Sequence, residues 1–305
     1  ILIFGATPVQ ELSTLLDYDL TPTLASGPMA EAFSHQAAAL GIRLQAHLKI
    51  DTGMGRLGIV AVPNTPEQGP FLPQAVEEVI HVCRLPGLDV QGIYTHLAQA
   101  DADDLTHAQG QVDCFSSLLQ ALSDHGLEFP LRHAANSAAV LRLPQAHLDL
   151  VRPGLMLYGL SPRPEDAGIT RDLHPALSLK ARIALVKTVA PGFKISYGST
   201  FTTDKKTTIA TIPIGYADGF FRILSNQGQM LVHGEPAPIV GRICMDQTML
   251  DVGHIPEVFA GDEVVIFGQQ GTQFLSVDEA AALSQTINYE IVSSLMARVP
   301  RFYPA

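Results

Sequence analysis

The stretch LKIDTGMGRLG, residues 48–58, places a lysine and an arginine at the two ends of a glycine-rich loop. Lys49 lies in an apolar segment typical of a buried strand, and Arg56 closes the loop that follows it. A glycine-rich loop after a strand can bind phosphate, but this stretch lacks the residue order of a P-loop or of a dinucleotide site. The loop therefore offers two cations to a ligand without identifying that ligand.

Polar side chains also stand at the ends of three further predicted strands. His96 ends GIYTH, Asn136 and Ser137 join a strand to a helix, and Arg152 ends LDLVR. Taken singly, each has a structural interpretation as a hydrogen-bonding histidine, a helix N-cap or a paired arginine. Because the carboxyl ends of parallel strands meet at one rim, we expect these side chains and Arg56 to face one site. Two guanidiniums, an imidazole and a helix N-terminus suit a phosphorylated cofactor or a sugar phosphate.

The second half of the chain carries further polar side chains in distinctive short stretches. Tyr197 lies in KISYGSTF, Tyr216 in IPIGYADGF and Tyr289 in TINYE, while Met245 and Asp246 interrupt the otherwise apolar predicted strand GRICMDQ. Tyrosine usually buries part of its ring and exposes its hydroxyl, so these residues alone identify no chemistry.

Two patterns of secondary structure position these residues. In the first half, amphipathic helices are predicted at residues 27–40, 73–83, 105–125 and 137–143. Short apolar runs between and around them predict strands at 1–5, 21–26, 44–50, 90–97, 131–136 and 148–154. Such alternation is typical of β/α units around a parallel sheet, and about six of the eight units of a (β/α)₈ barrel can be recognised.

The second half changes to short strands separated by glycine-containing turns. A proline-rich acidic connector at 161–175 precedes this change. We therefore predict a partial, cofactor-binding barrel at 1–172 and a mainly antiparallel β domain at 173–305. One late helix, 276–283, begins with a Ser-x-x-Glu capping box. The predicted turns are Gln227–Gly228, His233–Gly234 and Gln270–Gly271.

Composition limits the classes of function. The net charge of −11, with 30 acidic residues against 19 Lys and Arg, argues against nucleic acid or a membrane surface as partner. The three cysteines form no Cys-x-x-Cys pair, so neither a disulfide framework nor a metal site is expected. No apolar run reaches the roughly 20 residues that span a bilayer. The start ILIFG resembles no signal peptide, so a cytoplasmic location is expected.

Eight ordered motifs resemble those of the bacterial alanine racemase family. They are LKIDTGMGRLG, YTHLAQAD, HAANSAA, VRPGLMLYG, SYGSTF, IPIGYADG, GRICMDQ and TINYE. The resemblance implies a (β/α)₈ barrel followed by a β domain, a homodimer with shared active sites, and pyridoxal phosphate as cofactor. It also implies interconversion of L-alanine and D-alanine through a pyridoxal phosphate aldimine by two bases, which supplies D-alanine for peptidoglycan.

The resemblance also implies roles for individual residues. Tyr197 is the base for the L-enantiomer, contributed across the dimer interface. Arg56 lies beside the cofactor's phenolic oxygen and the substrate carboxylate, and a carbamylated Lys49 holds it there. Arg152 meets the pyridine nitrogen, with His96 in the same cluster.

The resemblance also implies which residues bind the cofactor phosphate and which lie near the substrate and its entrance. The phosphate is held by Asn136, Ser137, the backbone around Gly154, and Tyr289. Met245 of the partner subunit contacts the substrate with Asp246 beside it, and Tyr216 narrows the entrance.

The lysine that carries the cofactor as a Schiff base in this family, within a motif resembling VKANAYGHG, has no counterpart in this sequence. The lysines present are Lys49, Lys180, Lys187, Lys194, Lys205 and Lys206. We therefore expect a segment to precede Ile1, and we expect the 305 residues alone to be inactive.

Two alternatives remain open at this point. One is a non-catalytic remnant that binds a phosphate ligand or only dimerises. The other is a racemase of serine or another small amino acid, because one methylene changes binding by only ~1–3 kcal/mol.

Overall fold

The computed structural model describes residues 1–63, 69–163, 166–170 and 172–303. The chain divides into two compact units: unit 1 comprises residues 1–157 with 161–170, and unit 2 comprises residues 158–160 with 171–305. Positions 164, 165 and 171 of the expected connector lie outside the described residues. The division at residue 172 therefore stays a prediction.

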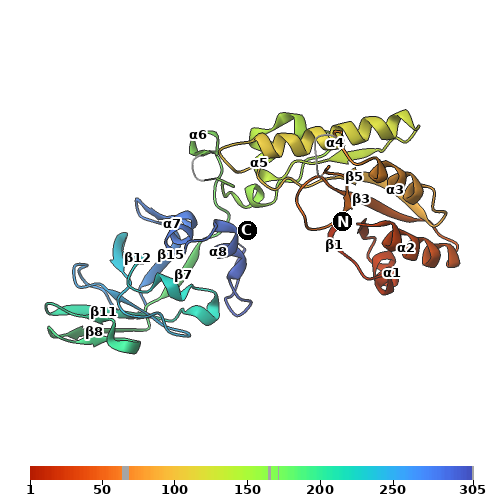
Figure 1. Cartoon of the computed structure of the whole chain (residues 1–305). Coiled ribbons are helices and arrows are strands. Elements are labelled where there is room, and N and C mark those ends of the chain that lie inside the picture. Colours follow the sequence, from red (N-terminus) through yellow and green to blue (C-terminus); the bar gives the residue numbers. More distant parts are fainter. Residues whose placement is uncertain (64–68, 164–165, 171, 304–305) are drawn as a thin grey trace. The chain divides into compact units, whose positions relative to one another are not determined.

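Unit 1 contains a parallel sheet with helices between its successive strands (Figure 1). The strand order is β1-β2-β3-β5-β6, with β4 paired to β3, and every pairing is parallel. The strands are β1 (Leu2–Ala6), β2 (Thr21–Leu24), β3 (Leu44–Asp51), β4 (Ile59–Val60), β5 (Leu88–Tyr94) and β6 (Leu131–His133). The helices are α1 (Leu12–Asp17), α2 (Gly27–Ala39), α3 (Pro73–Cys83), α4 (Thr106–Asp124), α5 (Ser137–Arg142) and α6 (Ala167–Thr170).

Side-chain alternation separates the apolar and polar faces of this sheet. On β3, Leu48 and Ile50 belong to the hydrophobic core that includes Phe33 of α2 and Phe115 of α4. The intervening Lys49 is buried as well, on the opposite face. The register sets His47 beside Thr23 and Gly92, and Lys49 beside Tyr94, which is itself beside His133. One face therefore packs against the helices while the other gathers buried polar groups.

Three of the four helices predicted in this half begin on the predicted residue and the fourth, α4, begins one residue later, because their apolar spacing and start signals are strong. The strand predicted at 148–154 is wrong, and β4 was not predicted. The 148–154 segment runs beside β6 through Asp149 N to Arg132 O (3.0 Å) and Arg152 N to Ala135 O (2.9 Å). The Asp149 carboxylate, not a backbone carbonyl, accepts the Arg132 N–H (2.8 Å), and Pro153 has no N–H to donate, so no regular ladder forms.

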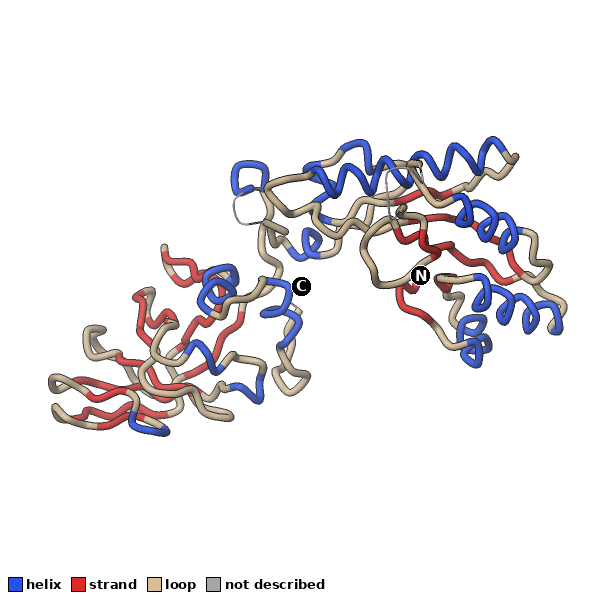
Figure 2. The backbone as a smooth tube through the Cα atoms, in the orientation of Figure 1, coloured by secondary structure: helices blue, strands red, loops and turns tan. Residues whose placement is uncertain are grey.

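Unit 2 is built from antiparallel strands (Figure 2). A five-stranded sheet has the order β13-β12-β15-β16 with β7 paired to β15, a three-stranded sheet has the order β14-β11-β8, and β9 pairs with β10. The strands are β7 (Leu179–Arg182), β8 (Leu185–Val189), β9 (Lys194–Ile195), β10 (Phe201–Thr202), β11 (Thr207–Ile212), β12 (Gln229–Val232), β13 (Glu235–Pro238), β14 (Thr248–Asp251), β15 (Glu263–Gln270) and β16 (Gln273–Leu275). The predicted fold class, β/α units followed by an antiparallel β domain, is confirmed.

Two local predictions in unit 2 need correction. GRICMDQ is a loop that precedes β14 and not a strand, so Met245 and Asp246 interrupt no ladder. Helix α7 (Val277–Leu283) is capped by Ser276, whose Oγ accepts from Asp278 N at 2.8 Å, and not by the reciprocal bonds of a capping box. Helix α8 (Asn288–Ser294), which carries Tyr289, was not predicted because its seven residues give too short a periodic signal.

Candidate active site

Arg152 is the centre of the polar face of unit 1. Its Nη1 donates to His133 Nδ1 (2.7 Å), and its Nη2 donates to the carbonyl oxygens of Thr95 (2.9 Å) and Ala134 (3.0 Å) and lies 3.3 Å from His96 Nδ1. Burial lowers the pKa of Arg152 to about 10, so the guanidinium is charged at neutral pH. Its Nε is buried and has no hydrogen-bond partner among the described residues. A buried N–H without an acceptor is costly, so this donor calls for an explanation.

The imidazoles around Arg152 are neutral. Burial and the nearby guanidinium lower the pKa of His96 to about 4 and that of His133 to about 3, and they lower the pKa of His47 as well. His47 Nδ1 lies 2.9 Å from His133 Nε2, and the Tyr94 ring stacks on His133 at 4.7 Å. The sequence analysis missed His47, Tyr94 and His133. Alternation along the strands could have found them, because each shares the face of Lys49 or Arg152.

Lys49 is a buried amine on the same face. It is 4% exposed, its Nζ donates to Ile50 O (2.6 Å), and it lies 5.5 Å from the Tyr94 ring centroid. Burial lowers its pKa to about 8, and the positive charges of Arg152 and Arg56 act in the same direction. Within the described residues Lys49 has no carboxylate partner at ion-pair distance. The amine is therefore unusually easy to deprotonate.

Asp51 shapes the glycine loop between Lys49 and Arg56. Its Oδ1 accepts the backbone N–H groups of Gly53 (2.9 Å), Met54 (2.9 Å) and Gly55 (3.1 Å). These bonds lower the pKa of Asp51, although burial opposes them. The Arg56 side chain beyond this turn is exposed and makes no hydrogen bond to another described residue. The loop thus presents a free guanidinium from an anchored turn.

Asn136 and Ser137 form a second anchored turn at the start of α5. Asn136 Oδ1 accepts from Ala139 N (3.1 Å), and its Nδ2 donates to Leu97 O (3.3 Å). Ser137 Oγ accepts from Gly154 N (2.9 Å), which joins α5 to the segment after Arg152. The space where a Gly154 side chain would begin is open. His96 therefore lies close to Arg152, and Ser137 is joined to Gly154, whereas no hydrogen bond or ion pair within the described residues joins Arg56 to either pair. The shared rim stays a prediction.

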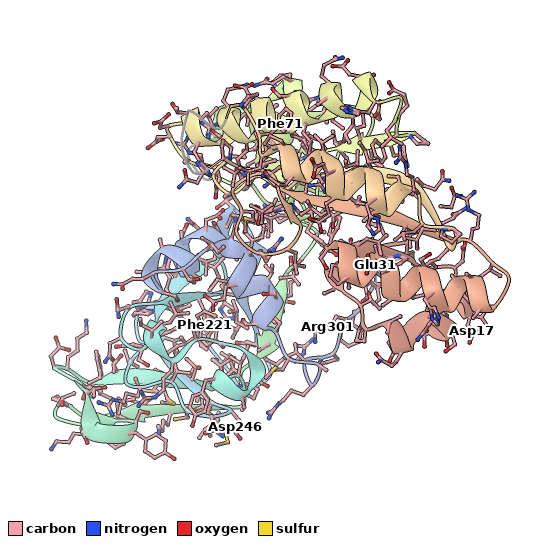
Figure 3. The ribbon with its side chains drawn as sticks, turned by 45° about the vertical axis from the view of Figure 1, so that its right-hand side comes forward. Asp17, Glu31, Phe71, Phe221, Asp246 and Arg301 are labelled. Carbon is pink, nitrogen blue, oxygen red and sulfur yellow. The ribbon has the colours of Figure 1, made fainter. Side chains whose placement is uncertain are left out.

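In unit 2, hydrogen bonds to the backbone connect the segments that carry the candidate residues. Tyr197, Tyr216 and Met245 are 70%, 43% and 58% exposed. Tyr216 N donates to Cys244 O (3.1 Å), Ala217 N donates to Met245 O (2.8 Å), and the Ser196 hydroxyl donates to Arg242 O (2.5 Å). Asp246 lies on the surface of this unit (Figure 3). These hydrogen bonds tie the Tyr216 turn and the Ser196 segment to the loop that carries Met245.

Tyr289 lies on α8, and 39% of its surface is exposed. It shares unit 2 with Tyr197 and Tyr216, whereas Ser137 and Arg152 belong to unit 1. The described residues contain no group of three or more His, Cys, Asp or Glu side chains that could hold a metal ion. None of the helices in the described part of the chain is long and apolar enough to cross a bilayer.

Comparisons with known proteins agree with these features. Residues 1–162 match the family model "Alanine racemase, N-terminal domain", and residues 176–303 match "Alanine racemase, C-terminal domain". The chain is 49% identical over 305 residues to the alanine racemase of Desulfosudis oleivorans, covering 99% of this chain and 77% of that protein. It is 46% identical over 303 residues to the alanine racemase of Carboxydothermus hydrogenoformans, covering 99% and 79%.

Solved structures give the same answer. The alanine racemase of Clostridium difficile 630 superposes with a TM-score of 0.88 at 36% identity, covering 98% of this chain and 74% of that chain. The Bacillus anthracis alanine racemase, solved with bound L-Ala-P, superposes with a TM-score of 0.84 at 35% identity, covering 100% and 76%. With both family models and these relatives matched along nearly its whole length, this chain belongs to the alanine racemase family.

Proposed function

We propose that this protein interconverts L-alanine and D-alanine, and that the unpartnered Nε of Arg152 is the donor to the ring nitrogen of pyridoxal phosphate. The family implies this cofactor, which when bound supplies an electron-withdrawing ring that acidifies the α-proton of an amino acid. The residues fit the cofactor, because a neutral pyridine nitrogen is an acceptor and Arg152 Nε is a buried donor that lacks one. This fit is the observation that carries the proposal.

Arg152 as the hydrogen-bond donor would determine whether the pyridine nitrogen of the cofactor is protonated. Even with its pKa lowered to about 10, Arg152 keeps its proton at neutral pH and does not transfer it to a pyridine. The ring nitrogen accordingly stays unprotonated and withdraws electrons less strongly than it would beside a carboxylic acid. A weaker electron sink disfavours transamination as a side reaction.

The phosphate is assigned to the start of α5 and the segment after Arg152. Asn136 and Ser137 hold this turn, and the open space at Gly154 allows an anion to approach the backbone. The hydroxyl of Tyr289 is assigned to the same phosphate. Arg56 and Arg152 give this face positive charge, which favours a phosphate and a substrate carboxylate.

Lys49 is proposed to be carbamylated. Only a neutral amine attacks CO₂, forming an N–C bond and releasing a proton to solvent, and a pKa of about 8 increases the neutral fraction at pH 7. The resulting anion would pair with Arg56, which has no acceptor among the described residues. Arg56 would then be held beside the substrate carboxylate and the phenolic oxygen of the cofactor.

Tyr197 is proposed as the base that removes and returns the α-proton of the L-enantiomer. Its exposed hydroxyl suits a surface that is completed by a second copy of the chain, as expected for a homodimer. Met245 is assigned to the substrate near its carboxylate with Asp246 beside it, and Tyr216 to the narrow entrance.

The base on the opposite face is the family's cofactor lysine. We assign it to none of the six lysines of this chain, because Lys49 has another role and the other five lie in the second half. The 305 residues alone are therefore proposed not to racemise alanine. A cytoplasmic location is proposed as well.

The experiment that tests this function follows α-proton exchange into D₂O and chirality with the purified holoenzyme. Alanine should exchange and racemise in both directions, and Arg152→Gln should slow both. Faster turnover of serine than of alanine would instead favour the serine alternative. Cofactor binding without α-proton exchange would favour a non-catalytic protein.

A further inference from the structure

We propose that Asp218 and Arg298 form a clamp that positions the substrate entrance of this racemase. The clamp joins two segments of unit 2. One is the 215–219 turn, which contains Tyr216, and the other is the 294–298 segment that follows α8. The inference rests on the proposed function, since it acts through the roles assigned to Tyr216 and Met245.

Asp218 is the centre of the clamp. Its side chain is 8% exposed, its Oδ1 lies 2.7 Å from Arg298 Nε, and its Oδ2 accepts from Gly215 N at 2.8 Å. Its carbonyl oxygen also accepts from Met296 N at 3.1 Å. A buried carboxylate is stable only when both oxygens are satisfied, and here each oxygen holds a different segment.

Steric fit shows that these segments are in close contact. Gly219 has φ +92, and a Cβ atom there would lie 2.2 Å from Ser294 O. The Ser294 hydroxyl in turn donates to Gly219 O at 3.1 Å. The turn therefore rests directly on the end of α8, and the Arg298 guanidinium reaches the same turn from beyond the helix.

The 215–219 turn also contacts the loop at residues 242–247, which contains Met245, the residue assigned to the substrate. A Cβ atom at Gly215 would lie 2.3 Å from Cys244 O, and the Tyr216 and Ala217 amides donate to the carbonyl oxygens of Cys244 and Met245. The Met245 side chain projects from this loop and is 58% exposed. The position of Met245 is thus set through the turn, and the turn is set by Asp218.

The loop extends this connection to Tyr197. The Ser196 hydroxyl donates to Arg242 O and lies 3.5 Å from Cys244 Sγ. Arg298 is hence linked to the segments of Tyr216, Met245 and Tyr197 through the Asp218 carboxylate, the backbone hydrogen bonds of the turn and the Ser196 hydroxyl. We assign Asp218 and Arg298 as positioning residues. Neither contacts the reacting atoms.

The test compares Arg298→Gln, Asp218→Asn and the double variant in the holoenzyme. Arg298→Gln should raise KM for alanine about five- to tenfold in both directions while kcat changes less than about twofold, since the clamp holds the Tyr216 turn directly and reaches Tyr197 only through the 242–247 loop. Asp218→Asn should do the same, because its amide then faces the Arg298 guanidinium. The double variant restores a neutral hydrogen-bonding pair and should recover most of the loss.

The matched control is Arg182→Gln. Arg182 is another exposed arginine of unit 2 and lies on β7. Its Nη1 donates to Gly261 O at 2.8 Å. The KM of Arg182→Gln for alanine should equal that of the parent protein. Amide hydrogen exchange over residues 213–220 and 242–247 provides a readout that does not depend on activity, and it should increase in Arg298→Gln but not in Arg182→Gln.

Unchanged exchange in Arg298→Gln would overturn the inference, and so would increased exchange with an unchanged KM. Tyr216→Phe and Met245→Ala separate this result from the proposed function. If neither changes KM while exchange responds to Arg298→Gln, the substrate roles of Tyr216 and Met245 are wrong and the clamp has no catalytic consequence. If either raises KM while Arg298→Gln does not, the roles stand and the clamp is wrong.

Discussion

Arg152 Nη1 lies 2.7 Å from His133 Nδ1, and His133 Nε2 lies 2.9 Å from His47 Nδ1. A guanidinium only donates, so Nδ1 of His133 is the acceptor and its proton must be on Nε2. His133 then donates to His47. The hydrogen bonds therefore run in one direction, from Arg152 to His133 to His47, and this order requires both imidazoles to be neutral.

Acid should therefore destabilise the protein through His133. Its folded pKa of about 3 lies below the unfolded value of 6.5, so the unfolded chain binds a proton first as the pH falls. The stabilisation is complete above pH 6.5 and is lost as the pH falls toward 3, by on the order of 2 to 3 kcal/mol between pH 6.5 and 4.5.

Urea unfolding of the holoenzyme at pH 7 and pH 4.5 measures this effect. His133→Gln should reduce the difference in the free energy of unfolding between the two pH values. His125→Gln, at an exposed histidine after α4, should leave the difference unchanged. An equal difference in His133→Gln and the parent protein would mean that His133 is not the titrating group.

Carbon dioxide in equilibrium with bicarbonate should react with the neutral Lys49 amine, forming an N–C bond and releasing a proton to solvent. With ¹³C-labelled bicarbonate, the holoenzyme should show one carbamate resonance by ¹³C NMR, and the signal should disappear in Lys49→Met. Lys180→Gln, at the exposed lysine paired with Glu263, should retain it. Loss of the resonance in Lys180→Gln, or its absence from the parent protein, would contradict the proposed modification.

Arg152→Glu should change the outcome of the reaction as well as its rate. A carboxylic acid can share a proton with the pyridine nitrogen, which strengthens the electron sink while the racemisation site is disturbed. Racemisation should slow, and the ratio of pyridoxamine phosphate formed to alanine racemised should increase. An unchanged ratio would mean that Arg152 does not contact the ring nitrogen.

Tyr197→Phe keeps the ring but removes the proton acceptor. Racemisation should fall by about 10²–10⁴-fold while the absorbance of the bound cofactor persists. Exchange of the α-deuterium should be lost more from L-alanine than from D-alanine, because the opposite base is intact. Equal loss from both enantiomers would argue against two bases. If Tyr197→Phe retained racemase activity, another residue would be the base for the L-enantiomer, and Tyr216 would be the next candidate.

Subunit mixing tests whether Tyr197 acts across a dimer interface. Heterodimers of Tyr197→Phe subunits with subunits that lack the cofactor lysine should recover one competent site. If Tyr197 acts within its own chain, no site should recover.

The 305-residue chain expressed by itself should show no D/L exchange of alanine, because we assign none of its lysines to the cofactor. Exchange at the rate of the holoenzyme would show that one of those lysines is the cofactor base.

Much of this protein was determined locally by its sequence. Apolar spacing placed α2 and α3, the short extended runs placed β2 and β3, and Asn136 marked a helix start that its side chain does cap. Ordered motifs identified the family. Such features depend on residues within one turn or one strand of each other, so periodicity and capping report them directly.

Only the tertiary structure decided the relations that give these residues their chemistry. The sequence placed Arg152 on a strand, but the structure shows an irregular segment. Its guanidinium bonds with His133, while Nε has no partner among the described residues. Asp218 meets Arg298, 80 positions along the chain, only because α8 returns the chain to the 215–219 turn. Sheet register and chain return bring together groups that are distant in sequence, and burial then sets their charge, so no local pattern could reveal them.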